Sequence, residues 1–319
     1  GKRFRALMAH VGYALSSGTP IEEVSLPHLS AALELYQASA LVHDDIIDKA
    51  DERRGMPTPH RTLADHHAAR SWIGSSTDFG RHSAILVGDF LFSAATAAAD
   101  EQALTLREDC ARTFVRRFAD MHAEVALGQY LDISAEQSPL DPERTDALSV
   151  SDSLEVALHK SAHYSVVHPA LLGAICAAPS FDRVAGLLDV LETILTPWGL
   201  AFQLRDDDLG VFGDPAVTGK PAGDDLREGK RTALLALTWE ASSPAERRAL
   251  TDVLGVAEAS AQQIATATDI VERNGRAAHE AEIVSLVADG DAALEASEFD
   301  ENARAMLREL CSILTARRA

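Results

Sequence analysis

Three aspartates, Asp44, Asp45 and Asp48, close an otherwise apolar stretch of the sequence. On a helix, Asp44 and Asp48 share one face because they are four residues apart, whereas Asp45 points about 100° away. Two carboxylates one turn apart repel each other unless a cation lies between them. Oxygen ligands at this spacing suit a hard divalent ion such as Mg²⁺, which keeps room for phosphate oxygens. Arg53 and Arg54 follow, and their guanidinium groups match the geometry of phosphate.

A second acidic stretch, Asp206 to Asp208, ends another apolar segment. A loop rich in glycine and proline follows it and carries Lys220 and Lys230. Taken alone, the first stretch is equally compatible with a solvated acidic helix end beside a basic turn. Two acidic helix ends, each followed by cations, together predict a cavity that binds several metal ions and a polyphosphate.

The combined pattern resembles the polyprenyl diphosphate synthase family, and most of all its short-chain geranylgeranyl diphosphate synthases. The first stretch matches the family's Asp-Asp-x-x-Asp-x₄-Arg-Arg-Gly, and the second matches Phe-Gln-x-x-Asp-Asp, a Gly-Lys-Pro loop and a closing Lys-x-Thr. The match runs from residue 1 to at least residue 235. One position departs from the pattern, because Gly210 stands where the second motif often has its last acid. We expect Asp206 and Asp207 to be the metal ligands there and Asp208 to point elsewhere.

The resemblance implies a Mg²⁺-dependent prenyltransferase that joins isopentenyl diphosphate to an allylic diphosphate and releases pyrophosphate, with about three Mg²⁺ ions in each active site. The implied metal ligands are Asp44, Asp48, Asp206 and Asp207. The implied catalytic residues are Asp44, Asp48, Asp206, Lys160 and Lys220. The implied isopentenyl diphosphate site consists of Lys2, Arg5, Gln37 and Arg54. The implied allylic diphosphate site consists of Arg53, Lys160, Ser161, Gln203, Lys220 and Lys230. These cations would stabilise the charge that develops on the leaving diphosphate, and the second diphosphate site would orient the double bond.

Product length in this family depends on the helix that carries the first motif, because the product tail grows along it until a bulky side chain stops it. The usual short-chain stop is an aromatic pair just before the first aspartate, where this sequence has Ser39 and Ala40. Tyr36 lies one turn further from Asp44. One turn is about 5.4 Å, close to the length of one isoprene unit. If Tyr36 is the floor, the main product is geranylgeranyl diphosphate.

Several alternatives stay open at this point. Tyr36 could simply pack between helices, with Phe90 or Phe92 setting the depth of the cavity, and the product could then be farnesyl diphosphate or a chain of C25 or more. A terpene cyclase on the same fold binds only one diphosphate and has no need for Lys2, Arg5 and Arg54. A non-catalytic partner subunit would be expected to lose an acidic motif, whereas this chain keeps both except at Gly210.

The hydrophobic periodicity predicts an all-α protein, which we expect to be one large helical bundle, residues 1–319, around a deep central cavity. No strand-like run and no repeat interrupts the helical pattern. We expect helices over residues 28–47, 84–99, 108–133, 152–177, 182–212, 233–241, 244–255, 258–274, 276–297 and 300–316. Residues 51–80 and 134–150 are polar and contain prolines, which predicts loops. Pro197 is expected to kink or divide its helix.

The formal net charge of −20 argues against nonspecific binding to nucleic acid. Three widely spaced cysteines favour a reducing compartment, so we expect a cytoplasmic protein. The 12 histidines are scattered, and no Cys/His cluster has zinc spacing. No apolar run is long enough to predict a transmembrane helix. The family resemblance further implies a homodimer, and a segment before Gly1, which falls within a family motif.

Overall fold

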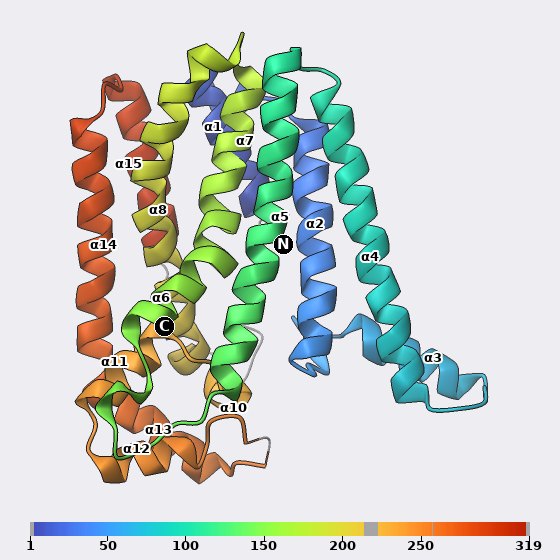
Figure 1. Cartoon of the computed structure of the whole chain (residues 1–319), viewed down its shortest axis with the longest axis vertical. Coiled ribbons are helices and arrows are strands. Elements are labelled where there is room, and N and C mark those ends of the chain that lie inside the picture. The colour runs from blue at the N-terminus through green and yellow to red at the C-terminus, as the bar shows by residue number, and fades with distance from the viewer. Residues whose placement is uncertain (1–2, 214–222, 257, 317–319) are drawn as a thin grey trace. The chain divides into compact units, whose positions relative to one another are not determined.

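The computed structural model describes residues 3–213, 223–256 and 258–316, and almost all of its regular structure is helical (Figure 1). The prediction of an all-α fold is therefore confirmed. The chain divides into two compact units, Gly1–Phe118 with Leu172–Val184, and Ala119–Leu171 with Ala185–Ala319. The predicted single domain stays a prediction.

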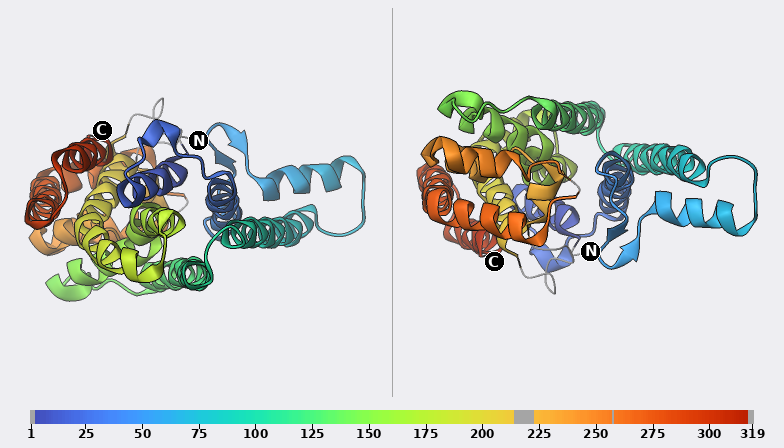
Figure 2. Two further views of the ribbon diagram at one scale, coloured as in Figure 1. Left: turned by 90° about the horizontal axis from the view of Figure 1, so that it is seen from above. Right: turned by 90° about the horizontal axis from the view of Figure 1, so that it is seen from below.

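The first unit is built around α2 (Pro27–Ile47) and α4 (Ser76–Ala103), which lie side by side (Figure 2). Its other elements are α1 (Phe4–Ser17), η1 (Ile21–Glu23), β1 (Glu52–Arg53), β2 (Met56–Pro57) and α3 (Pro59–Ala69), with the first part of α5 (Glu108–Gln137). Small residues at the contact let α2 and α4 approach closely. The Ser39 hydroxyl, which is buried, donates a 2.8 Å hydrogen bond to the carbonyl of Gly88.

The segment 51–80, predicted as a loop, contains regular structure instead. The segment begins with an antiparallel hairpin in which β1 and β2 are each two residues long. The helix α3 then runs alongside α4 (Figure 2). Pro59 misled the prediction because proline is well tolerated in the first turn of a helix, where its missing N–H has no partner to lose. Buried His60 and His67 give α3 an inward face that polarity alone does not reveal.

The second unit contains the rest of α5 and the helices that follow it. Its elements are η2 (Thr145–Ala147), α6 (Val150–Ala157), η3 (Leu158–Val167), most of α8 (Phe181–Phe212), α10 (Asp224–Glu228), α11 (Ala233–Ala241), α12 (Pro244–Thr251), α13 (Ala261–Asn274), α14 (Arg276–Ala296) and α15 (Glu301–Thr315). The helix α7 (His168–Ala177) begins here and ends in the first unit. Most of these bounds lie close to the predicted ones, and α8 continues through Pro197 without a break.

Part of the core of the second unit forms around Trp239 of α11, which is fully buried. Its indole N–H donates a 2.9 Å hydrogen bond to the carbonyl of Arg144, so the polar edge of the ring is satisfied. Buried Arg247 donates to the carbonyl of Trp239 and lies over the indole ring. The helices α11, α12 and α13 begin at the side-chain caps Thr232, Ser243 and Ser260, which fix where these helices start.

The predicted helix over 152–177 is not uniform, because its middle part, η3, is a π-helix. The wider i→i+5 turn is rare and often marks a functional site. Gly128 of α5 lies directly against it. A Cβ built on Gly128 would lie 2.4 Å from the backbone nitrogen of Lys160, so the two backbones approach closely only because this residue has no side chain.

Two helices, α4 and α8, are long and apolar enough to cross a membrane by length and composition. This is weak evidence for a membrane span, because the core helices of globular proteins pass the same test. In α4 much of the apolar character is exposed: Leu86 and Phe90, one turn apart, are 68% and 72% exposed. Packing within the first unit therefore does not account for these apolar side chains on α4.

We expect Gly128→Ala to destabilise the protein by about 1–3 kcal/mol, because the added methyl group forces the α5 backbone away from η3. Gly186→Ala in α8 is the matched control, since nothing lies within 4 Å of a Cβ there. That substitution should raise stability by about 0.5–1 kcal/mol. Denaturant unfolding of both variants measures the difference, and equal effects would show that the close approach at Gly128 is unimportant.

Candidate functional site

The first acidic motif lies at the carboxyl end of α2, in the first unit. Asp44 and Asp45 occupy its last turn, and Asp48 caps it with a 2.8 Å hydrogen bond from its backbone N–H to the carbonyl of Asp44. A helix carboxyl end carries partial negative charge, so three acids there are unfavourable without a cation. The last turn of α2 contains no basic residue. The cation must therefore come from outside the helix.

Arg53 supplies one such cation from the hairpin that follows α2. Its Nη2 lies 2.8 Å from Oδ2 of Asp44, and its Nε lies 2.6 Å from Oδ1 of Asp45. Asp45 is 2% exposed, and burial raises the pKa of its carboxyl while Arg53 opposes that rise. The Asp44 side chain is 24% exposed and remains accessible to a ligand. The two aspartates thus differ as helical geometry predicts: Asp45 packs inward against Arg53, and Asp44 faces outward.

The turn of this hairpin places Arg54 in a strained conformation. Arg54 has φ 55° and Gly55 has φ 72°, and such a turn favours Asn or Gly at its first position. A non-glycine residue held at positive φ is often found at functional sites. Arg5 and Gln37, the other described members of the predicted isopentenyl diphosphate site, lie in α1 and α2 of the same unit. Lys2 lies outside the described residues.

The residues predicted to control product length meet α4. Tyr36 is 6% exposed, and its ring packs edge-on against Phe92 with the centroids 5.9 Å apart. Phe90, the other aromatic candidate, is mostly exposed. Ser39 is tied to α4 through its hydroxyl, and Ala40 is half-buried. The structure therefore joins Tyr36 and Phe92, two candidates that the sequence treats as alternatives.

The second acidic motif lies near the carboxyl end of α8, in the second unit. Asp206 is exposed, whereas Asp207 is 7% exposed and accepts a 2.8 Å hydrogen bond from the Gln203 amide. Burial raises the pKa of Asp207 well above its ordinary value, and the nearby Asp225 carboxylate adds to the rise. Such a group is stabilised as an anion only by an added cation. Among the residues that the structure describes, the hydrogen bond to Asp207 comes from the neutral Gln203 amide.

Asp208, which the sequence places away from the metal ligands, pairs with Arg276 of α14. Its Oδ1 lies 3.3 Å from Nε of Arg276, whose guanidinium also lies 4.2 Å from the centroid of the Phe212 ring. Asp208 is only 4% exposed. It therefore joins two helices and is turned away from the accessible Asp206.

Gly210 leaves room for an acid from another helix. A Cβ built on Gly210 would lie 1.8 Å from Oδ2 of Asp225, which belongs to α10. The carboxylate of Asp225 thus fills the space beside the position where the second motif lacks its last acid. Asp225 belongs to no motif in the sequence, and no local pattern predicts that it lies beside α8.

Two of the predicted diphosphate-binding lysines converge on one aspartate in α5. Lys160 Nζ lies 2.5 Å from Oδ2 of Asp132, and Lys230 Nζ lies 3.6 Å from the same oxygen and 3.0 Å from Glu136 Oε1. Asp132 is 6% exposed. A buried acid between two lysines holds both side chains in place, which would lower the entropy that they lose on binding an anion. Ser161 follows Lys160 in η3, and Lys220 lies outside the described residues.

Glu124, one turn before Gly128 in α5, meets three histidines that sequence reasoning left unassigned. His159 Nδ1 and His163 Nδ1 lie 2.6 and 2.5 Å from its Oε1, and His168 Nε2 lies 2.6 Å from its Oε2. Burial alone would raise the pKa of Glu124, but the hydrogen bonds from the histidines hold it far below its ordinary range. The description of the histidines as scattered is therefore wrong for these three. The i, i+4 spacing of His159 and His163 is the signal that could have found them.

Known proteins are similar to this chain in sequence and in fold. The polyprenyl synthetase family matches residues 1–271. The chain belongs to that family. Family membership makes it an isoprenyl diphosphate synthase, a prenyltransferase, which confirms the sequence-based prediction.

Individual relatives are similar over most of their length. The chain is 31% identical to the geranylfarnesyl diphosphate synthase of Aeropyrum pernix, covering 86% of this chain and 76% of that protein. It is 32% identical to the geranylgeranyl diphosphate synthase of Mycobacterium tuberculosis, covering 87% and 70%. The crystal structure of a geranylgeranyl pyrophosphate synthase from Corynebacterium glutamicum, complexed with isoprenyl diphosphate and magnesium, is 37% identical with a TM-score of 0.87, covering 100% of this chain and 87% of that one.

We expect Asp44→Ala and Asp206→Ala each to lower turnover by at least ~10², the scale of losing one electrostatic stabiliser of the transition state. Asp208→Ala is the matched control, because it removes an equally acidic residue that pairs with Arg276. Its turnover should fall much less, although its stability should fall too. Steady-state rates at saturating Mg²⁺ make the comparison, and equal losses at Asp206 and Asp208 would show that the metal ligand is misassigned.

Proposed function

We propose that this chain condenses isopentenyl diphosphate with an allylic diphosphate, head-to-tail and in the trans configuration, and that its main product is geranylgeranyl diphosphate. The observation that supports this most is the pair of accessible acids, Asp44 and Asp206, each on a helix end that has basic residues near it. Relatives named for farnesyl, geranylgeranyl and geranylfarnesyl products all match this chain, so the product length is our inference.

The donor set fits divalent magnesium. Asp44, Asp48 and Asp206 offer carboxylate oxygens, the ligands that Mg²⁺ prefers, and Asp44 and Asp48 sit where a helix end repels negative charge. Bound Mg²⁺, about three ions by family resemblance, would neutralise the diphosphate as it leaves the allylic carbon. One solved relative, a Caulobacter crescentus polyprenyl synthase, is complexed with calcium and isoprenyl diphosphate, which supports a divalent-cation site.

The predicted binding residues would form two separate sites, one for each diphosphate. Arg53, Lys160, Ser161, Gln203, Lys220 and Lys230 would hold the allylic diphosphate. Lys2, Arg5, Gln37 and Arg54 would hold isopentenyl diphosphate. Cleavage of the allylic C–O bond leaves a carbocation, and the isopentenyl double bond attacks it to form the new C–C bond. The final proton is lost to the released pyrophosphate, so no protein base is required. Binding both substrates in this orientation provides most of the catalysis.

The two acidic motifs are expected to face each other across an apolar cavity. Asp44 belongs to the first unit and Asp206 to the second, so this arrangement is part of the proposal. A terpene cyclase would not need the isopentenyl diphosphate residues, and a non-catalytic subunit would not keep both motifs.

Incubation with labelled isopentenyl diphosphate, farnesyl diphosphate and Mg²⁺ tests the function directly. A C20 diphosphate is the expected product, whereas a cyclic hydrocarbon or no turnover would contradict the proposal.

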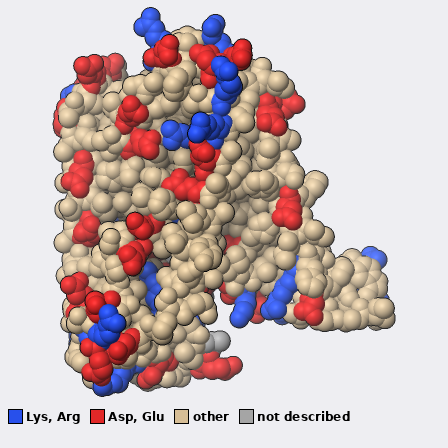
Figure 3. Space-filling view, viewed as in Figure 1, with Lys and Arg blue, Asp and Glu red and all other residues tan. Residues whose placement is uncertain are grey.

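We also propose a homodimer formed through the apolar face of α4. Leu86 and Phe90 are exposed on α4, and most of the surface at the right in Figure 3, where α4 lies, is uncharged apart from a few acidic side chains. Asp89, which precedes Phe90, is 62% exposed. Large exposed apolar patches mark interaction sites, and the family resemblance implies a second copy of the chain as the partner.

The three cysteines are free, with Cys110 and Cys311 buried, which fits the proposed cytoplasmic location.

Asp225, we propose, supplies the acid that Gly210 lacks. We expect Asp225→Ala to lower turnover at least tenfold and to raise the Mg²⁺ concentration needed for half-maximal rate, because one carboxylate beside Asp207 is lost. Adding Gly210→Asp to that variant should recover part of the loss. Asp224→Ala, which removes the preceding acid of α10, is the matched control. If both single variants behave alike, Asp225 has no special role.

Tyr36→Ala should lengthen the main product from C20 to C25 or beyond, because it opens one further turn, about 5.4 Å, along α2. The matched control is Phe90→Ala, which removes an aromatic ring from the exposed side of α4 and should leave chain length unchanged. Chromatographic sizing of the dephosphorylated products gives the answer. An unchanged C20 product in Tyr36→Ala would exclude Tyr36 as the floor, and a wild-type product of C30 or longer would overturn the whole assignment.

The paired substitution Leu86→Glu with Phe90→Glu should convert a dimer into monomers, because it places two charges on the face that we expect to be buried. Val284→Glu in α14, at another exposed apolar residue, is the control and should remain a dimer. Sedimentation at micromolar concentration distinguishes the species. A wild-type monomer would contradict the dimer, and flotation of the wild type with lipid vesicles would assign the face to a membrane instead.

A further inference from the structure

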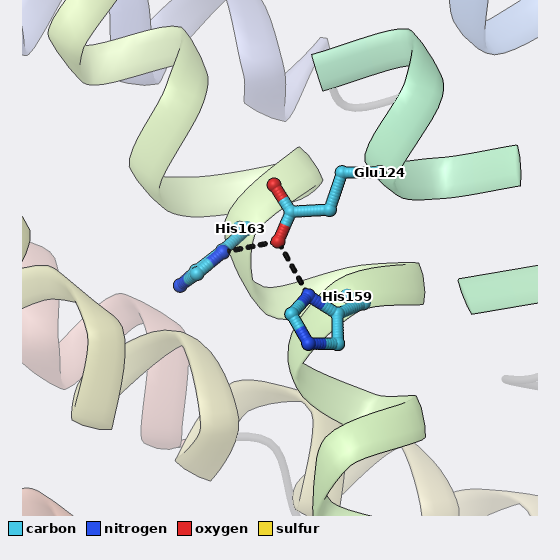
Figure 4. Close-up of side chains that lie close together, drawn as sticks. All are labelled: Glu124, His159 and His163. Carbon is cyan, nitrogen blue, oxygen red and sulfur yellow. Dashed lines mark hydrogen bonds and ion pairs between the residues drawn. The ribbon is translucent and has the colours of Figure 1, made fainter. Parts of the chain in front are cut away.

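One cluster of metal-ligating side chains lies outside the acidic motifs. It consists of Glu124 of α5 with His159 and His163 of η3, all of which lie in the second unit. One ligand atom from each lies within 4.8 Å of the other two, close enough for one ion to contact all three after small side-chain shifts. Figure 4 shows both imidazole rings turned so that their Nδ1 atoms face the same oxygen of Glu124.

The π-helix brings His168 to the face of η3 that carries His159 and His163. An α-helix has 3.6 residues per turn, so His159 and His168, nine residues apart, would lie about two and a half turns apart, on opposite sides. The i→i+5 bonding of η3 puts between four and five residues in each turn, so nine residues make about two turns. The backbone N–H of His168 bonds to the carbonyl of His163, as that geometry requires. His168 can therefore reach the same carboxylate from the same side.

We propose that Glu124, His159 and His163 bind one divalent transition-metal ion of the Zn²⁺ class. Two imidazole nitrogens and one carboxylate oxygen form a typical ligand set for Zn²⁺, whereas Mg²⁺ prefers oxygen ligands alone. The side chains of His159, Glu124 and His163 are 31%, 19% and 17% exposed, so an ion can reach them from solvent. A water molecule can complete the coordination in the fourth position.

His168 would orient the carboxylate rather than bind the ion. Its side chain is 6% exposed, and its Nε2 donates to Oε2 of Glu124, which leaves Oε1 for the metal. Hydrogen bonds of this kind to a ligating group typically change metal affinity by about 10–100-fold. Ligands at about 2.0–2.2 Å from a tetrahedral ion lie about 3.3 Å apart. The 2.5 and 2.6 Å separations to Oε1 would therefore need to widen by less than about 1 Å on binding, within the range of small rotamer changes.

The position of the cluster gives the ion a structural role near the active site. Lys160 lies between the two histidines in η3, and Asp132, which holds Lys160, lies two turns after Glu124 in α5. An ion that joins Glu124 to His159 and His163 would tie η3 to α5 on one side of Gly128, and the ion pair of Lys160 with Asp132 ties them on the other. The ion would thus hold η3 in its π-helical form and keep Lys160 in place.

Spectroscopic titration with Co²⁺ tests the site in the full-length protein. Protein treated with a chelator and then held in millimolar Mg²⁺, which fills the oxygen-only sites, is titrated with Co²⁺ and followed by visible absorption. We expect one equivalent to bind with the intense bands of a four- or five-coordinate site, and Zn²⁺ to displace it. His168→Ala should weaken Co²⁺ binding about 10–100-fold with the stoichiometry unchanged.

Two variants and one control separate the site from other histidines. His163→Ala and Glu124→Gln should each abolish the intense bands, while His28→Ala, at an exposed histidine of α2, should keep them. Circular dichroism of each variant checks that it is folded. The proposal is overturned if the wild type binds no Co²⁺ in the presence of Mg²⁺, or if folded His163→Ala binds one equivalent with the same spectrum. Because the readout does not depend on catalysis, this result is independent of the proposed prenyltransferase activity.

Discussion

Repulsion between carboxylates is the constraint on which the rest of this structure depends. Asp44 and Asp48 lie at the negative end of α2, and Asp207 is buried near the end of α8 beside Asp225. In their charged forms, the acids of each group repel one another unless a cation lies near them. The chain supplies some of these cations itself: Arg53 pairs with Asp44, and Arg276 pairs with Asp208. The acids that stay accessible, Asp44 and Asp206, are those that we assign to added metal ions.

The same electrostatic logic explains how the lysines are held. Asp132 is buried between Lys160 and Lys230, and the glycine at position 128 lets η3 lie close enough for Lys160 to reach it. A lysine held by a neighbouring acid is already ordered before substrate arrives. If these lysines bind the leaving diphosphate, as we propose, such ordering would favour its rapid neutralisation. Glu124 and its histidines extend this pattern along the same two helices.

Much of the fold could be predicted from the sequence, because helical periodicity is a local signal and the helices are long. The helix α3 was missed because Pro59 and several histidines make its sequence resemble a loop. The acidic motifs can be predicted because the aspartates of each motif lie within about one helical turn of one another in the sequence. The contacts of Asp225 with Gly210 and of Glu124 with His163 were missed because each joins residues distant in sequence. The π-helical turn, which no apolar pattern reveals, brings His168 to the side of η3 that carries His159 and His163.

The most direct test of the central claim is a crystal structure with Mg²⁺ and an unreactive allylic diphosphate analogue. We predict Mg²⁺ ions bound by Asp44, Asp48 and Asp206, each in contact with the diphosphate of the analogue. Separation of Asp44 and Asp206 by more than about two helix diameters, roughly 20–24 Å, would contradict it. A diphosphate bound away from both motifs would contradict it equally.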